Sequence, residues 1–185
     1  STPIKSSAAS DVYKRQLIGM IGGIGNSMIL GNFDSTFAAH PEMALYIPLI
    51  GGTGGNVGTQ SSAIVVQGLA NSSLDAKNTF KQVTKEAVVA LINATIISLL
   101  VYTYNFIRFG ATATVTYSVS ISLFAVVMFA SIFGTLVPMT LEKLKIDPAI
   151  ATGPFIAITN DIIGMMLYMG TVSYTHLRAH ETSAH

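Results

Sequence analysis

Long apolar stretches without charged residues alternate with short polar segments along most of the chain. Asp, Glu, Lys and Arg are absent from residues 43–74, 87–107, 109–141 and 148–160. A helix that spans a bilayer needs about 20 mostly apolar residues. The first three stretches reach this length, and the fourth does so if it includes Asp161 and runs from residue 149 to 172. With a shorter apolar run over residues 17–31, the pattern predicts an all-α membrane protein. We expect a bundle of five transmembrane helices per subunit, the first one truncated.

The composition excludes several classes of protein. Half of the residues are hydrophobic and 10% are charged, against about 25% charged in an average soluble domain. Such a chain is too hydrophobic to be disordered, and a net charge of +1 without a basic cluster does not suit nucleic acid. Cysteine is absent, which excludes disulfides and thiol catalysis. The sequence contains no nucleotide-binding motif. Its hydrophobic composition makes the lipid bilayer its first predicted partner.

The two ends of the chain depart from this pattern. Residues 1–16 are polar and lack helical periodicity, and residues 172–185 hold three of the four histidines. Parts of both segments (10–16 and 172–183) resemble translated adapter sequence. We therefore expect residues 1–16 and 172–185 to be non-native or disordered, and the transmembrane domain to occupy residues 17–171. His176 and His180 have a spacing that suits zinc on one helix face, but a frayed tail is the simpler interpretation.

Lysines are concentrated in alternate loops. The second and fourth predicted connections carry Lys77, Lys81, Lys85, Lys143 and Lys145. Of the other two connections, the first contains neither Lys nor Arg, and the third contains only Arg108. The positive-inside rule then predicts a multi-pass protein of the cell inner membrane, with a cytoplasmic N-terminus and the end of the fifth span outside. Residues 75–86 are either an amphipathic segment on the inner membrane surface or a plain hydrophilic loop.

The second predicted span is rich in glycine. Five of the eight positions from 51 to 58 are glycine, and each weakens a helix by about 0.8–1 kcal/mol relative to Ala. One interpretation is close helix packing, since the pairs Gly51/Gly55 and Gly54/Gly58 have a small-xxx-small spacing. The other is a narrow polar conduit, because polar groups in hydrocarbon need a partner or water. The side chains that would face such a conduit are Asn56, Thr59 and Gln60.

Asp161 is the only charged side chain inside any predicted span. A carboxylate within a membrane costs at least about 2.5–3.5 kcal/mol and marks a functional site by default. Ala157 and Gly153 would share its helix face, and Pro154 would free a backbone carbonyl to point at a pore. The alternative is a neutral Asp161 that is hydrogen-bonded within the bundle, for example to Asn56 or Gln60. No span offers a Lys or Arg partner, which suggests that a cation supplies the countercharge.

The ligand chemistry favours a hard divalent cation. The predicted lining offers only oxygen ligands, and no His or Cys lies in a predicted span, so zinc and copper are disfavoured. Oxygen ligands suit Mg²⁺, Ca²⁺ or Mn²⁺. Mg²⁺ keeps several waters and needs one or two carboxylates, which Asp161 from each of two symmetry-related chains would supply. A thin bundle of five helices also favours a pore near the interface of a homodimer.

Two motifs resemble the transmembrane domain of the MgtE magnesium transporters. They are PLIGGTGGNVGTQSSAIVVQGLA (residues 48–70) and, within residues 134–170, GTLVP followed by LEKLKIDPAIATGPFIAITNDIIGMMLYMG. The resemblance covers residues 17–171 and implies a homodimer with a Mg²⁺ pore lined by spans two and five. Without an ATP motif, uptake of Mg²⁺ would be passive. Members of this family usually carry cytosolic regulatory domains, and we expect none of these in the 16 residues before the first span. We therefore do not predict magnesium-dependent gating for this chain.

The resemblance also implies roles for individual positions. Asp161 would be the pore carboxylate that holds hydrated Mg²⁺, Ala157 would offer its carbonyl, and Gly153 would line the site one turn below. Gly52 and Gly55 match pore-facing glycines, and Thr59 stands where the family can carry Asn. The predicted metal site is therefore Asp161, Ala157 and Gly153, and the predicted pore lining is Gly52, Gly55, Asn56, Thr59, Gln60 and Asn160.

Two other functional classes remain as alternatives. A proton-coupled secondary transporter of another solute would use Asp161 as a proton relay. An intramembrane enzyme would want a second carboxylate, a His, or a Ser with a base, and Ser61 and Ser62 have no basic partner in any predicted span. We therefore predict that the chain is not an enzyme, with a non-transporting membrane subunit as the remaining alternative.

Overall fold

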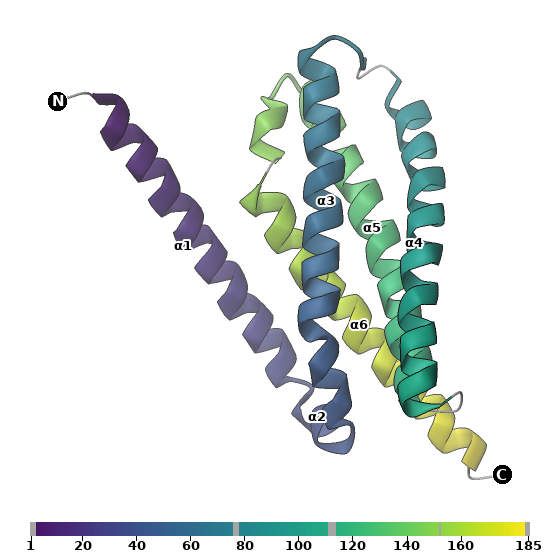
Figure 1. Ribbon diagram of the computed structural model, residues 1–185. Coiled ribbons are helices and arrows are strands. Elements are labelled where there is room, and N and C mark those ends of the chain that lie inside the picture. Colours follow the sequence, from purple (N-terminus) through teal and green to yellow (C-terminus); the bar gives the residue numbers. More distant parts are fainter. Residues whose placement is uncertain (1–2, 76–77, 111–113, 152, 184–185) are drawn as a thin grey trace.

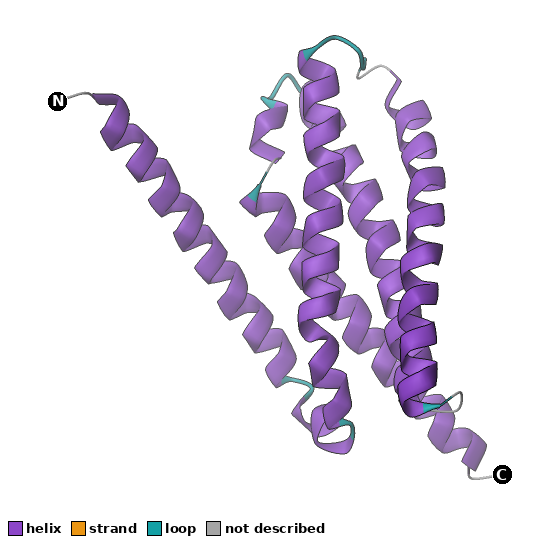
Figure 2. Ribbon diagram, viewed as in Figure 1, coloured by secondary structure: helices purple, strands orange, loops and turns teal. Residues whose placement is uncertain are grey.

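The computed structural model describes residues 3–75, 78–110, 114–151 and 153–183. Within these ranges the backbone is helical apart from short connections, and no strand is present (Figure 2). The elements in chain order are α1 (Pro3–Gly31), α2 (Asp34–Ala39), the 3₁₀ helix η1 (Pro41–Tyr46), α3 (Ile47–Ala70), α4 (Thr79–Phe109), α5 (Thr114–Lys143), the 3₁₀ helix η3 (Pro148–Ala151) and α6 (Pro154–Ser183).

Three of the described helices are long and apolar enough to cross a membrane. They are α4, α5 and the part of α6 from Pro154 to Thr175. The prediction of an all-α membrane protein is therefore confirmed, whereas the number of five spans stays a prediction. At 24 residues, α3 is also long enough to cross about 30 Å of hydrocarbon, but its glycines, amides and hydroxyls lower its hydropathy.

Helix α5 is the centre of the bundle. It packs against α3, α4 and α6, while α1 packs against α6 and stands to one side of the other helices (Figure 1). A cluster of buried apolar residues joins α3, α4, α5 and α6 to η1 and includes Met43, Ile50, Leu123, Met165 and Tyr168. Helix α4 lies at the periphery, and its outward face exposes aliphatic side chains that would contact lipid: Val88, Val89, Leu91, Ile92, Ile96, Leu99 and Leu100.

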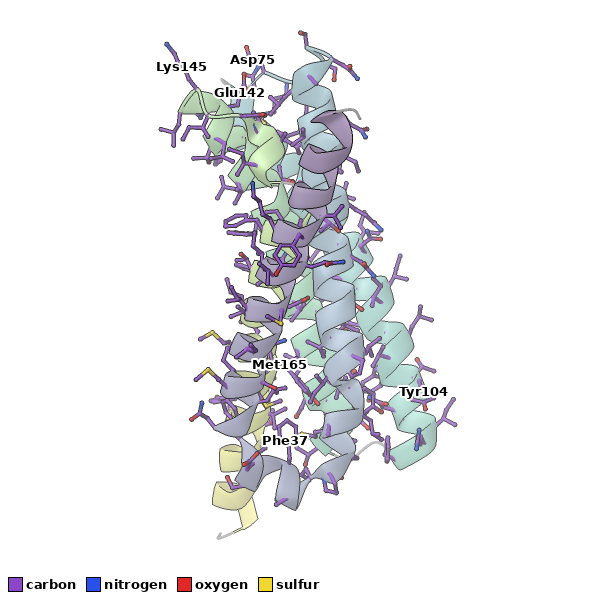
Figure 3. All side chains as sticks on the ribbon, turned by 90° about the vertical axis from the view of Figure 1, so that its left-hand side faces the viewer. Phe37, Asp75, Tyr104, Glu142, Lys145 and Met165 are labelled. Atoms are coloured by element: carbon purple, nitrogen blue, oxygen red, sulfur yellow. The ribbon has the colours of Figure 1, made fainter. Side chains whose placement is uncertain are left out.

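The two connections that carry lysines lie at the same end of the molecule. The α3–α4 and α5–α6 connections share one end of the bundle, and the α1–α3 and α4–α5 connections share the other (Figure 1). Figure 3 shows Asp75, Glu142 and Lys145 together at the first end, with Phe37 and Tyr104 towards the second. This arrangement is the one that the positive-inside argument requires, although the orientation in a membrane stays a prediction.

The terminal helices extend beyond the predicted domain. Helix α1 begins at Pro3 rather than near residue 17, and α6 continues to Ser183 rather than ending near residue 171. The described backbone is thus helical through most of both segments that we expected to be non-native or disordered; whether these segments are native to the protein stays a prediction. The side chains of His176 and His180, considered above as a zinc pair, lie outside the described residues.

The segment over residues 75–86, predicted to be a surface amphipathic segment or a loop, is largely helix. Because α4 begins at Thr79, the last eight residues of this segment form its first two turns, and neither a plain loop nor a separate surface helix describes them. Lys81 and Lys85 are exposed, whereas Glu86 is partly buried; Lys77 lies outside the described residues. Asp161 is therefore not the only acidic side chain within a long helix.

Two tyrosine hydroxyls anchor η1 to the bundle. The Tyr168 hydroxyl of α6 donates a hydrogen bond of 2.8 Å to the carbonyl oxygen of Met43, and both residues are fully buried. The Tyr46 hydroxyl donates to Oδ1 of Asn105 on α4. These bonds hold the segment that leads into α3 against α4 and α6.

Replacing Tyr168 with Phe is expected to lower the free energy of unfolding by about 1–3 kcal/mol, because the buried Met43 carbonyl would lose its partner. Thermal unfolding in detergent, followed by circular dichroism, would measure the change. Tyr174→Phe serves as the control, since Tyr174 of the same helix is exposed. Equal stability of the two variants would contradict the anchoring role.

Candidate functional site

Asp161 of α6 lies against the glycine face of α3. A Cβ atom added to Gly55 would lie 2.9 Å from Oδ1 of Asp161 and 3.9 Å from the carbonyl oxygen of Ala157. A Cβ added to Gly51, one turn earlier, would lie 3.8 Å from the same Asp161 oxygen. The absence of side chains on α3 therefore provides the space that the carboxyl group occupies, and places it beside the Ala157 carbonyl.

The Asp161 carboxyl group is partly buried and has no hydrogen-bond or ion-pair partner among the residues that the structure describes. The alternative in which an amide of α3 satisfies this group is therefore not the observed arrangement. The described residues contain no cluster of three or more His, Asp or Glu side chains that could hold a metal ion. Within one chain, a cation at this site would thus be held by one carboxylate, backbone carbonyls and water.

The start of α6 differs from the prediction at Gly153 and Pro154. Pro154 is the first residue of the helix, where its missing N–H interrupts no helical hydrogen bond, so it frees no carbonyl within a span. Gly153 precedes the helix with a φ of +68°, and its carbonyl accepts a hydrogen bond of 3.1 Å from the Ala157 amide. A Cβ at Gly153 would meet no atom within 4 Å, so this glycine, unlike Gly55, is not required by a close neighbour at its Cβ position.

The glycines of α3 face two different neighbours. Gly54 and Gly58 pack against α5 and α6, where added Cβ atoms would collide with Val126 and Asn160, respectively. Gly51 and Gly55 face Asp161 instead. Close packing therefore describes the side of α3 that carries Gly54 and Gly58. The side that carries Gly51 and Gly55 faces the Asp161 carboxyl group.

A polar stripe follows the exposed side of α3. Gly52, Asn56 and Gln60 are exposed, and their spacing of four residues places them on one face. Thr59 is partly buried beside this stripe, and its hydroxyl donates to the carbonyl oxygens of Gly55 at 2.8 Å and Asn56 at 3.1 Å. Amides in hydrocarbon need water or a partner, so the stripe is suited to a water-filled or protein-covered position.

Asn160 does not belong to this stripe, although it was predicted to line the pore. Its side chain is 1% exposed and packs against Gly58 inside the bundle. Neither amide atom has a hydrogen-bond partner among the described residues, and the same is true of the buried Thr135 hydroxyl of α5. Adjacent residues of a helix point about 100° apart, which separates Asn160 in the interior from Asp161 beside Gly55.

Sequence reasoning missed a second carboxyl group in the bundle. Oε1 of Glu86 on α4 accepts hydrogen bonds from the Ser61 hydroxyl of α3 at 2.8 Å and the Ser131 hydroxyl of α5 at 2.5 Å. The two serine oxygens are 3.1 Å apart, and both serines are buried. No feature of the sequence singles out Ser61 or Ser131 among the several serines of these two segments, and only the fold shows that they meet at Glu86.

Comparison with known proteins identifies the family. The sequence profile of MgtE, described as a divalent cation transporter, matches residues 47–171. The chain is 33% identical over 153 residues to the magnesium transporter MgtE of Bacillus subtilis, and 31% identical over 150 residues to that of Thermus thermophilus. These matches cover 83% and 81% of this chain but 33% of each relative, so the chain spans about a third of the length of these relatives. The chain belongs to the MgtE family of divalent cation transporters.

Proposed function

We propose that this chain forms a membrane-spanning pathway for Mg²⁺, with Asp161 as the carboxylate that holds the ion. The observation that carries the proposal is the position of Asp161, a carboxyl group against Gly51 and Gly55 with no partner among the described residues. An acidic group at membrane depth is costly without a countercharge. A bound cation supplies that countercharge, and the relatives that match this chain are named magnesium transporters.

The oxygen ligands of the site suit Mg²⁺. This ion dehydrates reluctantly and is held through waters and one or two carboxylates, so one Asp161 from each of two chains is sufficient. A homodimer would bring the two carboxylates together and would also cover the stripe of Gly52, Asn56 and Gln60. Asn56, Gln60 and the Ala157 carbonyl would then contact the water shell of the ion, whereas Asn160 would support α6 from within.

Transport in this proposal is passive and inward. The membrane potential contributes about 2.3 kcal/mol per elementary charge for each 100 mV, and Mg²⁺ carries two charges. The end of the molecule that carries Lys143 and Lys145 would face the cytoplasm, with the α1–α3 and α4–α5 connections outside. The protein would be located in the cell inner membrane.

Uptake by the purified chain in proteoliposomes tests the proposal. A Mg²⁺-sensitive dye inside the vesicles reports entry under an inside-negative potential. Asp161→Ala is expected to reduce uptake to the level of empty vesicles. Glu142→Ala is the matched control, because Glu142 is exposed near one end of α5, and it is expected to transport like the wild type.

Two results would overturn the proposal. Equal uptake by the wild type and Asp161→Ala would show that the cation pathway does not depend on Asp161. No uptake by the wild-type chain would show that this chain does not transport Mg²⁺. A proton relay makes a different prediction: Asp161→Ala would abolish acidification of the vesicle lumen under the same potential, and Mg²⁺ entry would be absent from both proteins.

A further inference from the structure

Glu86 joins the three helices α3, α4 and α5 through hydroxyl groups. Its Oε1 accepts from Ser61 at 2.8 Å and from Ser131 at 2.5 Å, and no ion pair of Glu86 is found among the described residues. Ser61 is 7% and Ser131 4% exposed, so water has little access to the two donors. The carboxyl group therefore links α3 to α5 at this level of the bundle.

A series of contacts leads from this junction to Asn160, the residue before Asp161. Ser61 lies one turn from Gly58 on α3, and Ser131 lies one turn from Gly134 on α5. The absence of a side chain on Gly134 leaves room for the carbonyl oxygen of Gly58, so the two helices touch through their backbones. Gly58 in turn packs against the amide of Asn160 on α6, the residue before Asp161.

We propose that Glu86 is a positioning residue for the cation site. By holding Ser61 and Ser131 together, it fixes the backbone contact between α3 and α5, and this contact sets where α3 presents its glycine face to α6. Glu86 acts through the helices and does not touch the ion. The inference rests on the proposed function, because its effect is expressed as Mg²⁺ affinity at Asp161.

The first test compares two substitutions of Glu86 in the proteoliposome assay, with Mg²⁺ as the probe. Glu86→Gln keeps a carbonyl oxygen that accepts from both serines, and its half-saturating Mg²⁺ concentration is expected to match that of the wild type. Glu86→Ala removes the acceptor and is expected to raise this concentration about five-fold, within the range of coupling through packed contacts. Glu142→Gln, an exposed acid, is the control. Protein yield in membranes is measured for every variant.

A disulfide can replace the junction. The chain contains no cysteine, and the serine oxygens are 3.1 Å apart, so Ser61→Cys with Ser131→Cys places two thiols within reach of each other. In the Glu86→Ala background, the oxidised pair is expected to restore the wild-type half-saturating concentration, and reduction is expected to raise it again. A general folding defect would not reverse with the redox state of one bond.

The outcomes separate this inference from the proposed function. Wild-type affinity in Glu86→Ala would overturn the positioning role while leaving Asp161 as the cation site. An equal loss in Glu86→Gln and Glu86→Ala would also overturn it, because charge rather than hydrogen bonding would then be the requirement. Wild-type uptake by Asp161→Ala, or none by the wild-type chain, would overturn the proposed function and this inference with it.

Discussion

Gly55→Ala is expected to remove most Mg²⁺ uptake while leaving the helix bundle intact. The added methyl group would lie 2.9 Å from Oδ1 of Asp161, which is too close for a carbon–oxygen contact. The oxygen lies at the end of a side chain, so the carboxyl group moves and the backbone does not. Displacing a binding group by about an ångström can reduce activity by up to about a hundred-fold, and we expect a loss of at least ten-fold in initial rate.

The stability of Gly55→Ala should rise or stay the same, although its Mg²⁺ uptake falls. Alanine is favoured over glycine within a helix by about 0.8–1 kcal/mol, which offsets the cost of moving the Asp161 side chain. The variant should therefore unfold at or above the wild-type temperature in detergent. Loss of uptake without loss of stability would locate the defect in the site.

Two other substitutions calibrate this result. Gly51→Ala places its methyl group 3.8 Å from the same Asp161 oxygen, an ordinary contact, so its loss of uptake should be much smaller. Gly170→Ala adds a methyl group to α6 where no atom lies within 4 Å, and its uptake should equal that of the wild type. If Gly55→Ala and Gly51→Ala transported equally, the glycine face would not confine the carboxyl group.

Gly134→Ala is expected to destabilise the bundle more than any other glycine-to-alanine substitution considered above. Its methyl group would collide with the carbonyl oxygen of Gly58, a backbone atom that cannot rotate away. The helices α3 and α5 would have to separate, and such overpacking costs about 1–3 kcal/mol. The gain of about 0.8–1 kcal/mol in helix propensity offsets only part of this cost.

Thermal unfolding in detergent measures this effect directly. The midpoint temperature of Gly134→Ala should fall below that of the wild type, whereas Gly170→Ala, which receives the same propensity gain without a collision, should unfold at or above the wild-type midpoint. A midpoint for Gly134→Ala equal to that of Gly170→Ala would show that the contact between α3 and α5 relaxes without cost.

Features that depend on local composition could be predicted well. The apolar stretches that became α4, α5 and most of α6 were visible because a membrane span needs a minimum apolar length. Asp161 was conspicuous because a carboxyl group is rare against such a background. The glycines of α3 indicated close approach of another element, and the structure places Asp161, Asn160 and Val126 against them.

Features that depend on distant partners could not be predicted. Glu86 was placed in the connection between the second and third predicted spans, whereas the structure places it in α4 with hydrogen bonds to serines that are 25 and 45 residues away in sequence. Gly153 was placed on the helix face of Asp161, but its positive φ and the proline after it start the helix one residue later.

The sequence by itself determined that the chain is helical, belongs in a membrane and carries one conspicuous carboxylate, because hydropathy and helix length are properties of each segment alone. Only the tertiary structure decided which neighbour each residue faces. Asn160 and Asp161 are adjacent, yet one is enclosed at Gly58 and the other lies beside Gly55, and neither side chain has a hydrogen-bond partner among the described residues. That difference is set by the packing of α6 against α3, and hydropathy does not encode how two helices are rotated against each other.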